Sequence, residues 1–275
     1  MSDQRGFDVT TYYMAHTLTE ADQVQRPGLT GEAAHDDVCS WLGFHSGPTI
    51  TDGIPALAGM YLHLAGILRA ELPEFECSTP GAAFVVEGWE QESDATRELY
   101  APETGLLPQA LRATRVGSVD HRDLTLAAAL AADLDQLKHY GLDPGRPETF
   151  AGIFARARYW PATGPFHARL FRQVMELTCP PRSSGSDTGR RMPAGFIGQL
   201  AFLRTTTNDL VTFESWASAK LCERTTREVI EPAIRAAAGR LQLGSVDFLP
   251  SRTVEADLLS IMLPSGGSNY VAPAT

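Results

Sequence analysis

Two strand-like segments in the first half of the chain carry side chains that can bind an aromatic ring and move protons. Tyr12 and His16 lie on one face of the first segment, because side chains two residues apart in a strand point the same way. Tyr61 and His63 share a face of the second segment. Since a histidine titrates near neutral pH, we expect His63 to act as a general base, with His16 as a second catalytic candidate. The tyrosines are candidate substrate contacts, and the alternative for both histidines is a structural role in a core or interface.

A second candidate site lies on a strand-like segment of the other half. Arg156 and Arg158 share a face with the aromatic residues on either side of them, Phe154 and Trp160. Two guanidinium groups beside aromatic rings can hold an anionic ring substituent or a flavin phosphate, and Trp160 can contact a substrate. The alternative is a solvated strand edge or an ion pair. His167 begins the next helix and is a further substrate-binding candidate, with a structural role at the helix start as its alternative.

Both candidate sites belong to a unit that occurs twice. When the sequence is shifted by 127 positions, eight residues between Glu87 and Asp120 coincide with residues between Glu214 and Asp247, among them Glu-x-Trp and Gly-Ser-Val-Asp. Composition alone would give roughly two. An upstream match between residues 58–65 and 194–201 has a shift of 136, so the first copy has the longer connection.

The repeated Glu-x-Trp sequence is predicted to be structural. A residue present in both copies serves the shared fold rather than one active site. We therefore expect Trp89 and Trp216 to pack in the core, with Glu87 and Glu214 as strand carboxylates.

The predicted element order in each copy is β-α-β-β-α-β, the ferredoxin-like split βαβ arrangement, which makes the fold class α+β. In the first copy we expect strands at Val9–Leu18, Met60–Ala70, Ala82–Trp89 and Ser118–Leu124, and helices at Ala33–Leu42 and Ser93–Leu111. In the second copy we expect strands at Gly152–Trp160, Phe196–Thr205, Leu210–Trp216 and Val246–Val254, and helices at Pro165–Leu177 and Ala219–Leu241. Ser218 is the predicted N-cap of the last helix, which Pro232 is expected to break or kink.

The repeat predicts an N-terminal domain over residues 1–124 and a C-terminal domain over residues 150–263. Residues 125–149 are predicted to form a bridging helix and linker, and residues 264–275 a flexible tail. The segment 179–193 carries three arginines. It is expected to be a flexible loop, or alternatively a lid that clamps an acidic group.

The composition argues against several classes of function. The 275 residues include 23 basic and 33 acidic ones, a net charge of −10, which disfavours a nucleic acid or an anionic membrane as partner. No run of 18 apolar residues occurs, so we expect no membrane span, and we expect no signal peptide. The four cysteines form no CxxC pair, which favours reduced thiols and a cytoplasmic location. Motifs for phosphate loops, zinc proteases and serine hydrolases are absent from the sequence, and no metal site is predicted.

The segment from Gly195 to Glu223 resembles the antibiotic-biosynthesis-monooxygenase family. It contains Phe213-Glu-Ser-Trp-Ala-Ser218 after a strand pair and before a helix. The first copy has Phe84-Val-Val-Glu-Gly-Trp89 in the same place, without the following serine. The resemblance covers residues 150–254 well and 7–124 loosely, and it implies ferredoxin-like domains of the dimeric α/β-barrel type. A tandem pair of such domains is similar to the oxygenases that open the B ring of angucycline polyketides in jadomycin, gilvocarcin and kinamycin pathways.

This resemblance implies an oxygenase that oxidises or opens a ring of a polycyclic phenol or quinone with O2. It implies reduced flavin, FADH2 or FMNH2, as cofactor, with a separate flavin reductase as partner, no metal, and a homodimer. It also allows a cofactor-free anthrone-type monooxygenase, in which the deprotonated phenol reduces oxygen itself. Two further alternatives are a duplicated βαβββ metalloenzyme and a non-catalytic binding or accessory protein for a polyketide intermediate.

Overall fold

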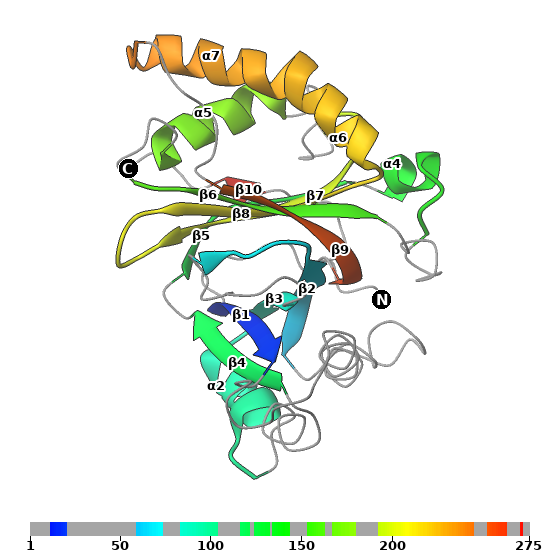
Figure 1. The fold of residues 1–275 in the computed structure, drawn as a ribbon, viewed down its shortest axis with the longest axis vertical. Coiled ribbons are helices and arrows are strands. Elements are labelled where there is room, and N and C mark those ends of the chain that lie inside the picture. The colour runs from blue at the N-terminus through cyan, green and yellow to red at the C-terminus, as the bar shows by residue number, and fades with distance from the viewer. Residues whose placement is uncertain are drawn as a thin grey trace. The chain divides into compact units, whose positions relative to one another are not determined.

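The computed structural model describes residues 12–20, 59–73, 83–103, 116–121, 124–132, 134–143, 153–162, 167–179, 192–244, 252–262 and 270–271. The chain divides into two compact units. The described residues of the N-terminal unit lie within Asp8–Arg122 and Val254–Pro264, and those of the C-terminal unit within Asp123–Thr253 and Ser265–Thr275. Each unit contains an antiparallel sheet and helical elements, which confirms the predicted α+β class (Figure 1).

The C-terminal unit is built on a sheet with the strand order β10-β5-β7-β8-β6. Its strands are β5 (Leu124–Ala131), β6 (Phe154–Trp160), β7 (Phe196–Arg204), β8 (Leu210–Trp216) and β10 (Tyr270–Val271). All their pairings within this order are antiparallel. The predicted strands at β6, β7 and β8 are confirmed to within two residues at each end. Every residue of β8 is buried, so this strand lies at the centre of the unit.

The turn between β7 and β8 is held by the carboxylate of Asp209. Asn208 has a φ of 59°, in the left-handed region that asparagine tolerates better than most residues. Asp209 accepts hydrogen bonds from the hydroxyls of Thr207 at 2.5 Å and Tyr159 at 2.6 Å, and from the backbone N–H of Ala162 at 2.8 Å. Burial alone would raise the pKa of Asp209, but these hydrogen bonds lower it overall. The predicted turn is confirmed, and its carboxylate also ties the end of β6 to the hairpin.

Helices cover one face of this sheet (Figure 1). They are α5 (Ala168–Thr178) and a second helical stretch made of α6 (Ala219–Thr225), the π-helical turn η4 (Thr226–Ile230) and α7 (Glu231–Arg240). Ser218 caps α6 as predicted, because its hydroxyl accepts a hydrogen bond from the backbone N–H of Leu221 at 3.3 Å.

Pro232 lies within the second helical stretch, where a break or kink is predicted, but the chain remains helical from Ala219 to Arg240. A proline has no N–H to donate, and its ring clashes with the carbonyl four residues earlier in a regular helix. The helix widens to π geometry in η4, directly before α7, and Pro232 lies in the first turn of α7. The chain therefore continues as a helix past the proline, with a change of hydrogen-bond pattern.

The core of the C-terminal unit lies between the sheet and these helices. Leu170 and Val174 of α5 are buried in this core, and Leu177 is partly buried against it.

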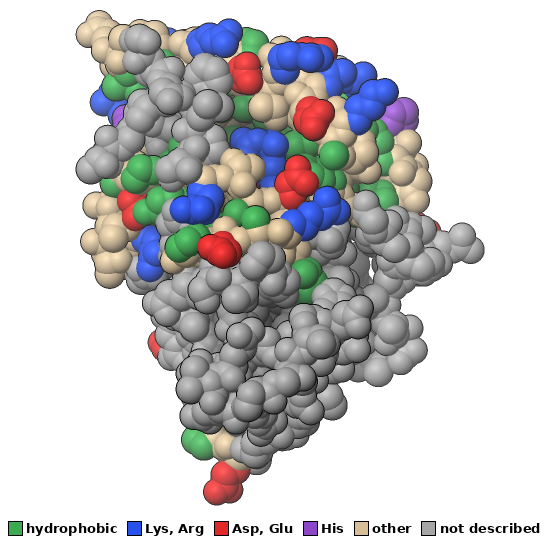
Figure 2. Space-filling view, in the orientation of Figure 1, with side chains coloured by type: hydrophobic (Ala, Val, Ile, Leu, Met, Phe, Trp, Pro, Cys, Tyr) green, Lys and Arg blue, Asp and Glu red, His purple; other side chains and the backbone are tan. Residues whose placement is uncertain are grey.

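The outer face of the helices is charged. Figure 2 shows basic and acidic side chains interspersed over this part of the surface. The exposed charged residues of α6, η4 and α7 are Lys220, Glu223, Arg224, Arg227, Glu228, Arg235 and Arg240. An apolar inner face with a charged outer face is typical of helices that cover a sheet. Among the described segments, none of the helices has the length and apolar content that crossing a bilayer needs.

The N-terminal unit has a sheet with the strand order β9-β2-β3-β1-β4. Its strands are β1 (Tyr12–Glu20), β2 (Met60–Leu68), β3 (Ala83–Trp89), β4 (Val116–His121) and β9 (Arg252–Met262). Its described helical elements are α2 (Glu92–Ala95) and η2 (Thr96–Tyr100), within the predicted helix at residues 93–111. The predicted strands at β1 to β4 are confirmed with ends shifted by up to three residues. The predicted helix at Ala33–Leu42 lies outside the described residues.

One prediction of secondary structure is wrong, and another is tested only in part. The predicted bridging helix over residues 125–149 begins instead with strand β5, which pairs with β7, and the short helix α4 (Leu134–His139) follows. The alanine-rich sequence of β5 favours a helix, but its burial beside β7 outweighs that propensity. Of the strand predicted at residues 246–254, residues 246–251 lie outside the described residues, and residues 252–254 form the start of β9, which continues to Met262.

These two strands each join the unit of the other copy. β5 follows the first copy in sequence and pairs with β7 of the C-terminal unit. β9 follows the second copy and pairs with β2 of the N-terminal unit. The two units therefore exchange their closing strands, and neither sheet is made from one continuous stretch of sequence.

Matched glycines precede the second strand of each copy. Gly59 and Gly195 have φ values of 87° and 81°. A Cβ atom at Gly59 would lie 2.6 Å from a side-chain atom of Asp94, and one at Gly195 would lie 2.6 Å from the Cβ of Leu221. These pairs of positions are related by the shifts of 136 and 127 found in the sequence. Both copies thus need a glycine here, for its left-handed backbone and for the close approach of a helix.

We expect Gly195→Ala to lower the free energy of unfolding by about 2–5 kcal/mol. The left-handed backbone costs an alanine about 1–2 kcal/mol, and the overlap with Leu221 adds about 1–3 kcal/mol. Gly244→Ala is the matched control, because its φ is 69° but no heavy atom lies within 4 Å of the added Cβ. Urea denaturation followed by circular dichroism measures both. If both variants lose the same free energy of unfolding, the overlap with Leu221 does not add to the loss.

Candidate functional site

The repeated Glu-x-Trp sequence makes the same internal hydrogen bond in both units. In β8 the indole Nε1 of Trp216 donates to Oε2 of Glu214 at 2.8 Å. In β3 the indole Nε1 of Trp89 donates to Oε2 of Glu87 at 3.1 Å. All four side chains are buried, which confirms the predicted core position of the tryptophans. Each sheet therefore holds a buried carboxylate in a fixed place, and the neighbours of that carboxylate differ between the units.

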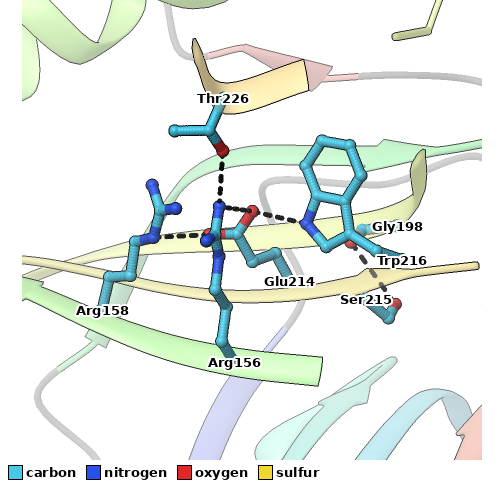
Figure 3. A network of polar contacts seen from close by, with 7 residues as sticks. All are labelled: Arg156, Arg158, Gly198, Glu214, Ser215, Trp216 and Thr226. Atoms are coloured by element: carbon cyan, nitrogen blue, oxygen red, sulfur yellow. Dashed lines mark hydrogen bonds and ion pairs between the residues drawn. The ribbon is translucent and has the colours of Figure 1, made fainter. Parts of the chain in front are cut away.

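In the C-terminal unit Glu214 binds two arginines of the adjacent strand β6 (Figure 3). Nε of Arg156 donates to Oε1 of Glu214 at 2.8 Å, and its Nη2 lies 3.4 Å from Oε2. Nε of Arg158 lies 2.9 Å from the same Oε1 atom. Arg156 also donates from Nη2 to the hydroxyl of Thr226 at 3.1 Å, which links the sheet to η4. The predicted shared face of the two arginines is confirmed, and we call Arg156, Arg158 and Glu214 the buried triad.

The buried triad is withdrawn from water. The exposed fractions of its side chains are 9% for Arg156, 11% for Arg158 and 2% for Glu214. A buried ion pair is stable only when its geometry is good and its other polar atoms are hydrogen-bonded. The triad carries two positive charges and one negative charge, so one positive charge is not neutralised within it.

A cavity of about 40 Å³ lies beside the triad, between the sheet and the helices of the C-terminal unit. Arg158, Glu214, Gln199 and Thr178 form its polar lining, and the rest of the lining is mainly apolar. This volume admits roughly two to three water molecules. Pockets for drug-sized ligands measure about 300–1,000 Å³. The described cavity is therefore suited to a small ligand and not to a polycyclic ring system.

The two described cysteines are buried free thiols, as predicted. Cys222 lies on α6 and Cys179 lines the cavity. Burial, together with the charge of Glu214, raises the pKa of the Cys222 thiol to about 12. Cys39 and Cys77 lie outside the described residues.

We expect Cys222 to resist alkylation by iodoacetamide at pH 8 in the native protein. With a pKa of about 12, about one thiol in 10⁴ is ionised at that pH, and the thiolate is the reactive form. Peptide mapping by mass spectrometry separates Cys222 from the other cysteines. The same protein unfolded in guanidinium chloride is the control and should be labelled fully. Rapid labelling in the native state would contradict the described burial.

The equivalent carboxylate in the N-terminal unit has histidines at the neighbouring register positions. Glu87 pairs with His63 on β2 and with Met14 on β1, and His16 follows two residues after Met14. At the corresponding positions the C-terminal unit has a glutamine and the two arginines of the triad. The structure describes the backbone of His16 and His63 and not their side chains. The register thus brings both predicted catalytic residues to the strands beside one buried carboxylate.

The predicted tyrosine contacts have different positions in the same sheet. Tyr12 pairs with Trp89 at the start of β1, on a strand whose described register is regular. Tyr61 falls at a register irregularity at residues 60–62. A bulge can change the alternation of side chains, so the shared face of Tyr61 and His63 stays a prediction.

The predicted substrate contacts of the C-terminal unit separate in the structure. Trp160 lines the cavity, with the Cζ atom of Arg158 at 6.0 Å from its ring centroid. His167 occupies the N-cap position of α5 and is not among the residues that line the cavity. Burial, aided by the charge of Arg169, lowers the pKa of His167. The structure therefore brings Arg158 and Trp160 together and leaves His167 at the start of the helix.

Sequence reasoning missed Glu214 and Thr226 as partners of the arginines. Glu214 was assigned a structural role because it occurs in both copies. The signal that could have found it is the alternation of charge on two predicted neighbouring strands, with two arginines on one and a glutamate on the other. Using that signal requires the pairing register, which the sequence does not contain.

Arg156 and Arg158 do not fit the predicted role of holding a flavin phosphate. Arg156 directs its Nε and Nη2 atoms to Glu214 and Thr226, so those donors are occupied within the protein. The adjoining cavity of about 40 Å³ is too small for a flavin ring system. A flavin bound to this chain would need a place outside this cavity.

No protein-family model and no curated protein matches the chain by sequence. Among solved structures, the chain is similar to a provisionally assigned monooxygenase from Lactobacillus acidophilus, with a TM-score of 0.54 and 10% identity over 95% of this chain and 100% of that one. It is also similar to a provisionally assigned monooxygenase from Fusobacterium nucleatum, with a TM-score of 0.56 and 10% identity over 96% of this chain and 99% of that one. These similarities show a shared fold that extends over nearly the whole chain.

Proposed function

We propose that this protein is an oxygenase that oxidises or opens a ring of a polycyclic phenol or quinone with O2, in the biosynthesis of an aromatic polyketide of the angucycline type. The observation that carries the proposal is the fold that the chain shares, over 95% and 96% of its length, with two provisionally assigned monooxygenases. Because fold alone does not determine function, the proposal depends on the chemistry of the residues that the fold positions.

We place the catalytic site on the sheet of the N-terminal unit. In the C-terminal unit the corresponding sheet face is occupied by the buried triad and large aromatic side chains, which leave a cavity of about 40 Å³. The N-terminal unit has His63 and His16 at the positions that correspond to a glutamine and an arginine of the C-terminal unit. The proposal is that the second copy lost a substrate pocket and the first copy kept one. The same proposal takes the N-terminal and C-terminal units to be copies of one ferredoxin-like unit.

In this site His63 would remove the proton of a phenol or enol. Glu87, opposite His63 in the register, would stabilise the imidazolium that results. The substrate anion then supplies electrons to O2. In net terms a ring CH2 group and O2 give a ring carbonyl and water, so atoms and electrons balance with the substrate as the reductant.

Reduced flavin, FADH2 or FMNH2 from a separate reductase, is the second electron source that the proposal includes. It would supply two electrons to O2 for reactions in which the substrate cannot be the reductant. The chain's own residues would contribute orientation, a base and exclusion of water in either case. A homodimer in a cytoplasmic setting is part of the same proposal, and light scattering on the purified protein measures its oligomeric state.

Oxygen labelling tests the proposal. The purified full chain is incubated with ¹⁸O2 and a panel of anthrones and hydroxylated tetracyclic quinones, in one series without cofactor and in another with chemically reduced flavin. Incorporation of one labelled oxygen atom that requires the folded protein supports the proposal, and the series in which it occurs identifies the electron source. No incorporation in either series would overturn it. Tight binding of the aromatic compounds without oxygen consumption would indicate a binding or accessory protein instead.

A further inference from the structure

Within the part of the chain that the structure describes, the buried triad of the C-terminal unit has one more positive charge than negative charge. Glu214 is shared between Arg156 and Arg158, with both Nε atoms within 2.9 Å of its Oε1 atom. Among the residues that line the adjoining cavity, Glu214 is the one carboxylate. Because a buried charge without a counter-charge is costly, this arrangement favours binding of an anion.

Arg158 is the residue of the triad whose terminal guanidinium N–H groups are not used within the triad. Arg156 uses Nε and Nη2 on Glu214 and Thr226. Within the part of the chain that the structure describes, Arg158 contacts Glu214 through Nε. Figure 3 shows the terminal nitrogens of Arg158 pointing away from Glu214. Arg158 lines the cavity, so its two Nη groups are available to a ligand there.

The strand next to Arg158 has a further polar atom without a partner among the described residues, although its residue, Thr212, is not one of those that line the cavity. Thr212 lies directly opposite Arg158 in the β6–β8 register. Its Oγ1 atom is buried and has no hydrogen-bond partner among the described residues. Polar groups that are buried without partners are rare in native proteins and call for an explanation such as a bound ligand or ion. The hydroxyl of Thr212 can donate a hydrogen bond on the face of the sheet that carries Arg158, and such a donor favours a ligand that accepts hydrogen bonds.

The size and shape of the cavity restrict that ligand. A volume of about 40 Å³ fits a ligand of a few non-hydrogen atoms. The guanidinium fork matches two oxygens of a planar anion, and the apolar lining around it strengthens charge-assisted hydrogen bonds.

We propose that the C-terminal unit binds a small planar monoanion at Arg158, a carboxylate of the size of formate or acetate, or bicarbonate. The site neutralises the triad and is separate from the oxygenase site proposed in the N-terminal unit. Because it depends on charge balance within the C-terminal unit, failure of the oxygen-labelling experiment leaves it unaffected.

Thermal unfolding in sodium formate, compared with sodium chloride at equal ionic strength, tests this site. With formate at about a hundred times its dissociation constant, we expect a rise in Tm of roughly 4–6 °C over chloride. Arg158→Gln should abolish the rise. This variant is expected to fold, because it leaves Arg156 and Glu214 as a balanced pair. Arg235→Gln, which removes an exposed arginine of α7, is the control and should keep the full rise.

Calorimetric titration with formate provides a second measurement. Arg158→Lys keeps the charge but loses the two-pronged donor, so we expect formate to bind roughly tenfold more weakly than to the wild type. An equal rise in Tm for the wild type and Arg158→Gln would overturn the proposal. So would the absence of any formate heat in the wild type, or binding to Arg158→Lys as tight as to the wild type.

Discussion

Glu214→Gln is expected to lower the free energy of unfolding by about 3–5 kcal/mol, because it leaves two buried guanidinium groups without a counter-charge. Glutamine has the shape of glutamate, and its one oxygen can still accept the hydrogen bond of Trp216, while its amide nitrogen cannot accept from the arginines. The loss therefore reports the charge and the acceptor that the arginines lose, and not the packing. Urea denaturation followed by far-ultraviolet circular dichroism measures the difference.

Glu231→Gln is the matched control for this result. Glu231 forms an i,i+4 ion pair with Arg235 on the surface of α7, at 3.8 Å. Exposed pairs of this kind contribute about 0–1 kcal/mol. Adding Arg158→Gln to Glu214→Gln should recover part of the loss, since one fewer cation is then left unpaired. If Glu214→Gln lowers the free energy of unfolding no more than Glu231→Gln does, the charges of the triad do not stabilise the unit.

His63→Ala is expected to lower turnover in the oxygen-labelling assay by about 10²–10⁴-fold, the usual contribution of a general base. The acidic limb of the pH–rate profile should disappear with it, because the unprotonated imidazole is the form that accepts the substrate proton. Stopped-flow measurement of O2 consumption across the pH range gives both quantities.

His139→Ala is the control for His63→Ala. His139 is an exposed histidine at the end of α4, and it lies in the C-terminal unit. Its replacement should leave turnover and the pH profile unchanged. Unchanged turnover in His63→Ala, with the protein folded, would remove His63 from the mechanism. Loss of turnover without a change of the pH profile would indicate a structural role for His63.

Much of the secondary structure follows from local patterns in the sequence. The alternation of β6 and the hairpin of β7 and β8 were predicted to within two residues at each end, because strands with one face in a core carry a period of two. The cap at Ser218 was predicted for a similar reason, whereas the break or kink predicted at Pro232 is replaced by a continuous helix with a π-helical turn before the proline. A helix cap depends on hydrogen bonds between residues that are close together in the chain, so the neighbouring sequence is sufficient to predict it.

The strand β5 shows where local patterns fail. Its sequence, Leu124-Thr-Leu-Ala-Ala-Ala-Leu-Ala131, has no alternation and a high content of good helix formers. It forms a strand because it pairs with β7, about 70 residues further along the chain. The free energy of that pairing and burial exceeds the small differences in helix propensity, and it depends on a partner that the local sequence does not reveal.

The duplicated Glu-x-Trp unit can be recognised from the sequence alone, with polar aromatic residues concentrated in the first copy and two arginines on one strand of the second. What lies beside each buried carboxylate becomes known only from the fold: two arginines around Glu214, and histidine positions on the strands next to Glu87. The physical reason is that the charge balance of a buried group depends on the register of neighbouring strands, which is set by the packing of the whole sheet.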